Sequence, residues 1–267
     1  MSFVLIDRPR PGIALITLNR PERMNAMAFD VMIPLKQALE EISWDNDVRV
    51  VVMTGAGHGF CSGADLEDPG ALPGVDGLTL TSIARRALEL LDDVILTLRR
   101  MHQPVIGAIN GAAIGGGLCL SLATDVRIAS ESAYFRAAGI NNGLTASELG
   151  LSYLLPRAIG SSRAFDIMLS GRDVDAVEAE RIGLVSRTVP QEVLLDACYE
   201  LAERMMGFSR VGIECTKRLL WSSLDAGSLS SHMDHEGHAQ LYVRLTTQNF
   251  EEAIRARREK RSPDFQD

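Results

Sequence analysis

The 267 residues, of which 46% are hydrophobic and 23% charged, suffice for one large globular domain and exclude a disordered, collagenous or coiled-coil chain. The formal net charge of −8 disfavours nucleic acid and anionic membranes as partners, and the longest apolar run is too short to predict a membrane span. The four cysteines form no C-x-x-C pair, and charges interrupt the N-terminal segment where a signal peptide needs an apolar run, so we expect a cytoplasmic protein.

Strands and helices are expected to alternate through the first half of the chain. β-rich segments are predicted at 3–6, 12–18, 48–55, 105–109 and 125–129, and helices at 30–43, about 79–101 and 118–123. The Gly/Pro-rich residues 55–78 are expected to be irregular. Because strand, glycine turn, helix and strand follow one another, we predict an α/β core rich in parallel strands.

Helical signals dominate from about residue 161 onward. One short strand is expected at 184–189, and helices are expected at 191–207, 210–225 and 249–260. We expect two regions, a core of residues 1–195 and a helical region of residues 196–267.

Several familiar motifs are incomplete. Residues 55–59 begin like a dinucleotide-binding fingerprint, but Phe60 stands where its last glycine belongs. His235 and His238 are one residue too close for the zinc motif H-E-x-x-H, and no metal is expected. The chain contains no G-x-S-x-G, so the usual serine-hydrolase turn is absent from the sequence. The basic residues 255–261 fit a solvated helix end better than a phosphate contact.

The strongest local signal is the run of three glycines at 115–117, which follows a predicted buried strand and opens a helix. Glycines let a ligand approach the backbone closely, and the free N–H groups of a helix start favour negative charge. The same pattern is also compatible with nothing more than a tight strand–helix crossing.

Several segments, taken together and in their order along the chain, make it similar to the crotonase, or enoyl-CoA hydratase/isomerase, superfamily over nearly its whole length. They are LNRPERMNAM (18–27), GFCSGADL (59–66), PVIGAINGAAIGGGLCL (104–120), LLPRAIGSSRA (154–164), the A-x-x-A-E-x-I-G-L-V segment (176–185) and EKRSPDF (259–265). The resemblance implies an α/β spiral of repeated ββα units followed by a C-terminal helical trimerisation region. It also implies an acyl-CoA substrate, no separate cofactor, and a homotrimer or a hexamer built as a dimer of trimers.

The resemblance implies an oxyanion hole, in which two backbone N–H groups hold the thioester oxygen as it becomes enolate-like. By position these belong to Ala64 and Gly116, and such preorganised donors stabilise developing charge strongly. The substrate-binding positions implied in the same way are Ala26, Cys61, Ser62, Gly63, Asp65, Leu66, Gly115, Cys119, Gly139, Asn141, Lys260 and Phe265, the last two being candidates to reach the pocket across a subunit interface.

The sequence departs from a typical hydratase of this superfamily, which uses two glutamates to hold and deprotonate water. At those two positions this chain has Cys119 and Gly139. One carboxylate remains, that of Glu148, eight residues before Pro156. Peroxisomal-type Δ3,Δ2-enoyl-CoA isomerases carry their single catalytic glutamate at a similar offset, and chlorobenzoyl-CoA dehalogenases carry their nucleophile close to it. The structural alternative is that Glu148 only begins a helix, where a carboxylate in the first turn is stabilising.

These observations favour an enoyl-CoA isomerase with Glu148 as its base, because a single base suffices to move a double bond. The first alternative is an enoyl-CoA hydratase of β-oxidation with a divergent water site, for which Asn141 and Asn142 are the candidates. The second is a catalytically weak homologue that binds acyl-CoA.

Overall fold

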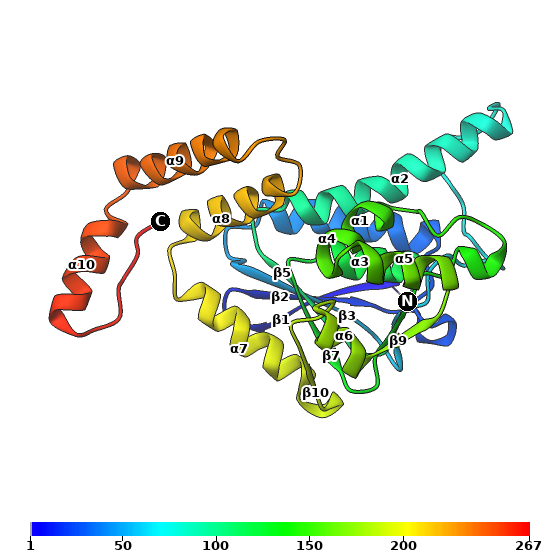
Figure 1. Cartoon of the computed structure of the whole chain (residues 1–267), viewed down its shortest axis with the longest axis horizontal. Coiled ribbons are helices and arrows are strands. Elements are labelled where there is room, and N and C mark those ends of the chain that lie inside the picture. The colour runs from blue at the N-terminus through cyan, green and yellow to red at the C-terminus, as the bar shows by residue number, and fades with distance from the viewer. Residues whose placement is uncertain (1) are drawn as a thin grey trace.

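The computed structural model describes residues 2–267, which form two β-sheets surrounded by helices (Figure 1). The larger sheet has the order β1-β2-β3-β5-β7-β10, with bounds Val4–Arg10, Ile13–Leu18, Val50–Gly55, Val105–Ile109, Val126–Ser130 and Arg187–Val189. Strands β1 and β2 form an antiparallel hairpin, and all later pairs in this sheet are parallel. The predicted parallel-rich α/β core is confirmed.

A second sheet has the order β4-β6-β8-β9, with bounds Gly59–Cys61, Ala112–Ile114, Tyr134–Arg136 and Asp173–Asp175. The chain visits the two sheets alternately: β3 then β4, β5 then β6, β7 then β8. Helix α2 (Leu80–Arg100) follows the first of these pairs and helix α3 (Gly116–Ala123) follows the second. Each turn thus adds one strand to each sheet, which is the spiral of ββα units expected from the resemblance.

These short strands were not predicted, and β4 lies inside the segment that we expected to be irregular. Each of the four has three residues, too few for an alternating pattern to stand out in the sequence. Two predicted strands are also shorter in the structure, since β3 begins at Val50 and β10 at Arg187.

The larger sheet is buried on both faces, which explains why β3 reads as an unbroken apolar run. One face, including Val51 and Met53, packs against α1 (Phe29–Ser43), α2 and α3. The opposite face, including Val50 and Val52, packs against α7 (Leu194–Met206). The boundary expected at residue 195 therefore falls within a helix that covers the sheet.

The remaining helices of the body are short. They are α4 (Leu151–Ile159), α5 (Ser161–Ser170) and α6 (Ala176–Ile182), with 3-10 turns η1 (Pro21–Arg23), η2 (Ile140–Asn142) and η3 (Gln191–Val193). Helices α4 and α5 pack against each other, and α4 also contacts α3. No helix among residues 2–267 is both long and apolar enough to cross a membrane.

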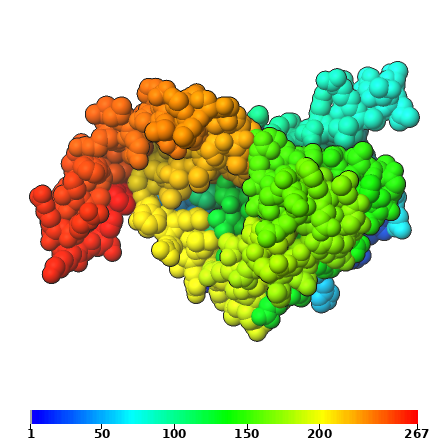
Figure 2. Space-filling model, in the orientation of Figure 1, coloured from blue at the N-terminus to red at the C-terminus, as the bar shows by residue number. Residues whose placement is uncertain are grey.

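Three helices after α7 extend from the body as an arm: α8 (Arg210–Ser223), α9 (Leu229–Thr246) and α10 (Asn249–Glu259) (Figures 1 and 2). Lys217 fixes α8 to the body, because its buried ammonium donates to the carbonyls of Leu98 and Gln103 and pairs with Asp125 at 2.9 Å. Helix α9 is described in full and contains no buried residue. The arm is therefore anchored at its base. Beyond it, α9 contacts α8 and α10, and the Asp267 carboxylate accepts from the N–H groups of Arg210 and Val211 at 3.1 and 3.2 Å.

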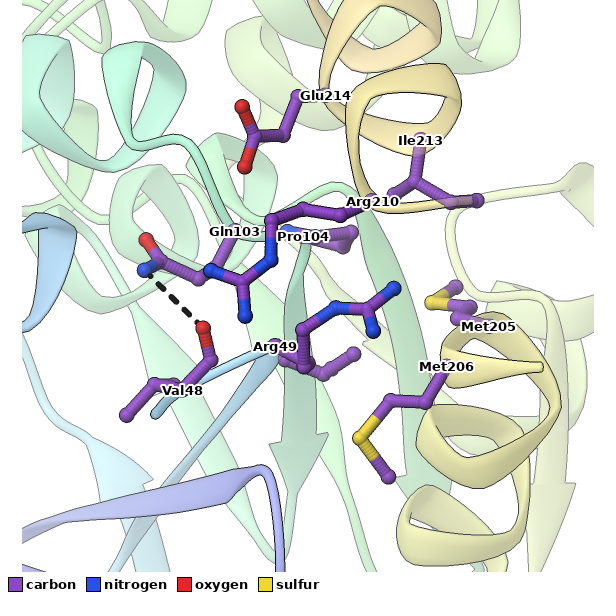
Figure 3. A pocket seen from close by; sticks show the side chains of 10 residues that line it. Val48, Arg49, Gln103, Pro104, Met205, Met206, Arg210, Ile213 and Glu214 are labelled. Carbon is purple, nitrogen blue, oxygen red and sulfur yellow. Dashed lines mark hydrogen bonds between the residues drawn. The ribbon is translucent and has the colours of Figure 1, made fainter. Parts of the chain in front are cut away.

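The base of the arm also carries two arginines around a cavity of about 10 Å³ (Figure 3). Arg49 donates to the carbonyl of Phe208 at 2.9 Å, and Arg210 donates to the carbonyl of Asn46 at 2.6 Å. Burial, and then the neighbouring Arg210, lower the pKa of Arg49. Both guanidinium groups bond to backbone across the α7–α8 joint, so we assign them to fixing the arm.

Candidate active site

The candidate site lies where β4 and β6 end side by side. These strands pair in parallel, with Gly59 opposite Ala112 and Cys61 opposite Ala113. The residues that follow them, Gly63–Ala64 and Gly115–Gly116, are therefore brought together by the pairing. A Cβ built on Gly63 would lie 2.7 Å from the carbonyl oxygen of Ile114 and 3.4 Å from the nitrogen of Gly116. Only glycine permits this approach of the two backbones.

The turn after β4 points the Ala64 N–H away from Met27, which lies on the neighbouring segment. Met27 donates to the carbonyl of Gly63 at 2.7 Å and accepts from the N–H of Asp65 at 3.0 Å, which makes a parallel bridge between Met27 and Ala64. Such a bridge uses the backbone groups of residues 63 and 65 and leaves those of Ala64 itself pointing outward. Ala64 is exposed, so its N–H is accessible.

The second N–H belongs to Gly116, the first residue of α3. Helix starts have unpaired N–H groups, and the helix dipole makes this end attractive to negative charge. Within residues 2–267, the N–H groups of Ala64 and Gly116 donate to no backbone acceptor. Two unpaired donors therefore lie at the adjoining ends of two strands, as an oxyanion hole requires.

Asp65 holds this turn in place. Its buried carboxylate accepts hydrogen bonds from Arg20 at 2.9 Å and Arg23 at 2.5 Å, and from the backbone N–H groups of Glu67 and Asp68. The hydrogen bond from Arg23, followed by the one from the backbone of Asp68, holds the pKa of Asp65 well below its usual range. These contacts join the turn to the segment of Arg20 and Arg23, so the Asp65 side chain supports the turn.

Asn25 is a second support, which the sequence analysis missed. Its φ of 55° lies in the left-handed region, which asparagine tolerates better than most residues. Its buried side chain donates to the carbonyls of Ala56 and Gly59 at 2.9 and 2.8 Å and accepts from the N–H of Arg20. It thus ties the 20–27 loop to the start of β4. An asparagine inside the motif LNRPERMNAM was the available signal.

The carboxylate of Glu148 reaches the same place from a different segment. Its Oε1 lies 3.2 Å from where a Cβ on Gly115 would be. Glu148 precedes α4, which starts at Leu151, so it is not simply the first residue of a helix. Leu149 and Gly150, with φ of 45° and 81°, make the turn that separates it from the helix. The glycine run and Glu148, far apart in sequence, therefore share one site.

Electrostatics suit Glu148 to accept and return a proton. Among the described residues, its carboxylate has no hydrogen-bond or ion-pair partner, and the side chain is partly buried. Burial raises the pKa of Glu148 above its ordinary value. A raised pKa brings a carboxylate closer to the range in which it can act as both base and acid near neutral pH.

Cys119 and Gly139 offer no comparable group. Cys119 is fully buried, and burial followed by the charge of Glu148 raises the pKa of its thiol well above the usual value. A Cβ on Gly139 would lie 1.9 Å from the carbonyl oxygen of Thr145, so this turn has no room for a side chain. The amide of Asn141 donates to the carbonyl of Gly171 at 3.2 Å, at the end of α5.

The other implied binding positions divide into two groups. Ala26, Cys61 and Ser62 lie on the two segments that meet at the Met27–Ala64 bridge, and burial raises the pKa of the Cys61 thiol to about 12. Leu66 follows the turn and is 72% exposed. Lys260 instead ends α10, and Phe265 lies on the C-terminal tail, which turns back along the arm and lines a pocket with Phe208 and Gly212 at the start of α8. In Figure 1, α10 and the C-terminus lie away from α4. One chain does not bring these last two residues to the site.

Comparison with known proteins agrees with this geometry. The family model for enoyl-CoA hydratase/isomerase matches residues 8–267. The chain belongs to the enoyl-CoA hydratase/isomerase family. The resemblance read from the sequence is thereby confirmed, and the protein is an enzyme of the crotonase superfamily.

No group of three or more His, Cys, Asp or Glu side chains in the described part of the chain is placed to hold a metal.

Individual relatives carry both reaction names. The chain is 72% identical over 267 residues to a probable enoyl-CoA hydratase, EchA12, of Mycobacterium bovis, covering 100% of this chain and 94% of the relative. A crystal structure of a probable enoyl-CoA hydratase/isomerase from Mycobacterium abscessus is 73% identical, with a TM-score of 0.96 and coverage of 100% and 99%. A structure described as a monofunctional enoyl-CoA isomerase from M. smegmatis is 66% identical, with a TM-score of 0.75 and coverage of 87% and 99%.

Proposed function

We propose that this enzyme shifts the double bond of an enoyl-CoA thioester, using Glu148 as its single acid–base group and the N–H groups of Ala64 and Gly116 as its oxyanion hole. The observation that carries the proposal is the position of Glu148 Oε1, 3.2 Å from the site of a Cβ on Gly115 and therefore beside the second donor of the hole. The family membership and the relative described as a monofunctional isomerase support it.

The reaction proceeds in two proton transfers. Glu148 removes a proton from C2 of a 3-enoyl-CoA, and the electron pair moves through C1 onto the thioester oxygen, giving a dienolate. The two N–H groups stabilise that negative charge, which develops only along the reaction coordinate. Protonated Glu148 then returns the proton to C4, and the double bond lies between C2 and C3. Atoms and electrons balance without any cofactor, since CoA is part of the substrate.

Isomerisation needs only a single base, whereas hydration needs more groups. Adding water to a 2-enoyl-CoA requires groups that position the water, take one proton from it and deliver another to C2. The buried thiol of Cys119 is a poor proton acceptor, Gly139 has no side chain, and the Asn141 amide is engaged with Gly171. The name of the mycobacterial relative favours hydration as the alternative reaction. Glu148 would then need a water held by groups outside this set.

The decisive experiment assays both reactions on the wild type and on Glu148→Gln. The matched control is Glu192→Gln, which makes the same carboxylate-to-carboxamide change at an exposed position. We expect 3-enoyl-CoA to be converted to the conjugated 2-enoyl-CoA by the wild type and the control. Loss of the general base should lower kcat by about 10²–10⁴-fold while acyl-CoA affinity changes little. Robust hydration that survives Glu148→Gln, with no isomerisation by either protein, would contradict the proposal. Binding without turnover in any assay would favour the acyl-CoA-binding alternative.

We further propose that the enzyme is a homotrimer, or a hexamer built from trimers, held together through the arm. Support comes from large exposed apolar side chains along α9, at Leu229, Met233, Leu241 and Leu245. Assembly would also allow Lys260 and Phe265 to approach the site of a neighbouring subunit. Light scattering should give a mass three or six times that of the chain, and a stable monomer that is fully active would exclude this arrangement.

A further inference from the structure

Gly115 stands apart from the two glycines that follow it. Its φ of 52° and ψ of −119° lie outside the regions open to residues with a side chain, and it is the N-cap of α3. A Cβ at Gly116 or Gly117 would strike Met27 or the backbone of Cys61. A Cβ at Gly115 would instead meet Glu148 Oε1 first, at 3.2 Å, and then Ala138 at 3.7 Å.

The carboxylate of Glu148 thus rests against the bare α-carbon of Gly115. No described group donates a hydrogen bond to this carboxylate, so packing alone determines where its oxygens lie. The backbone of Glu148 is held separately, because its carbonyl accepts from the N–H of Leu151 at 2.7 Å and from the thiol of Cys119 at 3.5 Å. With the backbone fixed, the space left by the missing Cβ sets how closely the carboxylate approaches the hole.

We propose that Gly115 is a positioning residue, whose lack of a side chain sets the distance between the Glu148 carboxylate and the substrate carbons held below the oxyanion hole. This role rests on the proposed isomerase function. A methyl group at 115 would stand 3.2 Å from Glu148 Oε1, so the carboxylate must move outward by a few tenths of an ångström. Because a displacement of about 1 Å at a reacting group can cost about a hundredfold in rate, this smaller shift costs a smaller factor, about tenfold or less. Substrate binding is largely spared, because the base acts in the transition state.

The test is a double-mutant cycle between Gly115→Ala and Glu148→Asp. Aspartate draws the carboxylate back by one methylene, so in the wild-type background it lowers kcat. In the Gly115→Ala background, the carboxylate is already displaced, and the shorter side chain avoids the new methyl. We therefore expect Gly115→Ala to lower kcat by about tenfold or less with KM nearly unchanged, and Glu148→Asp to cost less in that background than alone. Such non-additivity is the signature of direct contact.

Gly160→Ala is the matched control for backbone strain. Gly160 has φ 83° and ψ 154°, a conformation as unfavourable for alanine, but a Cβ there would meet nothing within 4 Å. This variant should lose thermal stability and keep kcat. Equal costs of Glu148→Asp in both backgrounds, or wild-type kcat in a folded Gly115→Ala enzyme, would overturn the proposal. Retained activity in Glu148→Gln would instead refute the proposed function.

Gly115→Ala could be too unstable to assay. Gly115→Ala/Glu148→Ala is then the informative protein, since removing the carboxylate removes the contact. Recovery of soluble protein, or of most of the melting temperature lost in the single variant, supports the inference. A double variant as unstable as Gly115→Ala assigns the defect to backbone strain alone and overturns it.

Discussion

The thiol of Cys119 donates a hydrogen bond to the backbone carbonyl of Glu148 across 3.5 Å. Cys119 stands where hydratases resembling this chain carry their first catalytic glutamate. Here its side chain instead holds the backbone of Glu148, the residue that carries the one remaining carboxylate. Its own N–H donates to the carbonyl of Gly115 at 3.1 Å, within the first turn of α3. The residue that departs most from the hydratase pattern is therefore part of the framework around the candidate base.

Restoring the carboxylate at position 119 should not restore hydration. Cys119 has no exposed surface, and a second glutamate cannot enter at Gly139 without displacing Thr145. We expect Cys119→Glu to lose melting temperature and isomerase activity, because a buried carboxyl displaces its neighbours and desolvates its charge. Cys119→Ala, which removes only the thiol, should remain folded. A rise in hydration rate of tenfold or more in Cys119→Glu would show that the water site is intact.

The pH dependence of turnover should report Glu148. Burial raises its pKa, and the base must be deprotonated to act, so kcat/KM falls as the pH is lowered through a value above that of an ordinary glutamate, about 4.3. The same shift means that protonated Glu148 favours the folded state, and this contribution is lost as the pH rises through the folded pKa. Melting curves should accordingly show Glu148→Gln gaining stability relative to the wild type as the pH is raised. An acidic limb at or below 4.3 would exclude Glu148 as the titrating group.

Substitution at Gly116 should disable the oxyanion hole while leaving the fold intact. A Cβ there would come within 2.3 Å of Met27 Sδ, and a methionine side chain is flexible enough to move. Alanine keeps the backbone N–H, but its methyl group crowds Met27 and Leu149 and so shifts the donor from its place in the hole. Because losing such a donor altogether costs about 10²–10³-fold, we expect Gly116→Ala to lower kcat by up to that factor. Gly116→Ala/Met27→Ala separates the causes, because it relieves the clash with Met27. Full recovery in the double variant would locate the defect in packing against Met27, and unchanged turnover in Gly116→Ala would contradict the prediction.

Asp65→Asn should destabilise the fold strongly. It leaves the buried guanidinium of Arg20 without its closest charged partner, and breaking a buried pair typically costs about 3–5 kcal/mol. Because the folded pKa of Asp65 is lowered, its contribution is present at neutral pH and fades as the pH falls below about 4. Urea unfolding of both proteins from pH 7 to pH 3 measures this. A stability difference independent of pH would contradict the assignment.

The sequence by itself determined the family, the parallel-rich α/β core and the glycine run that opens α3. Those features are local, because a buried strand such as β3 carries its apolar residues in one short stretch and a helix start shows its glycines directly. The motifs also singled out Glu148 and the loss of carboxylates at Cys119 and Gly139.

Only the tertiary structure decided which of these residues meet. The pairing of β4 with β6 brings Ala64 beside Gly116, and both strands are too short to be read from hydrophobic alternation. The approach of Glu148 to Gly115 depends on a turn with two positive φ values and on α4 packing against α3. Helices α9 and α10 form an arm whose main contacts within residues 2–267 are with each other and with α8, while the large apolar side chains of α9 stay exposed. Each of these depends on contacts between residues distant in sequence, whose geometry no local pattern encodes.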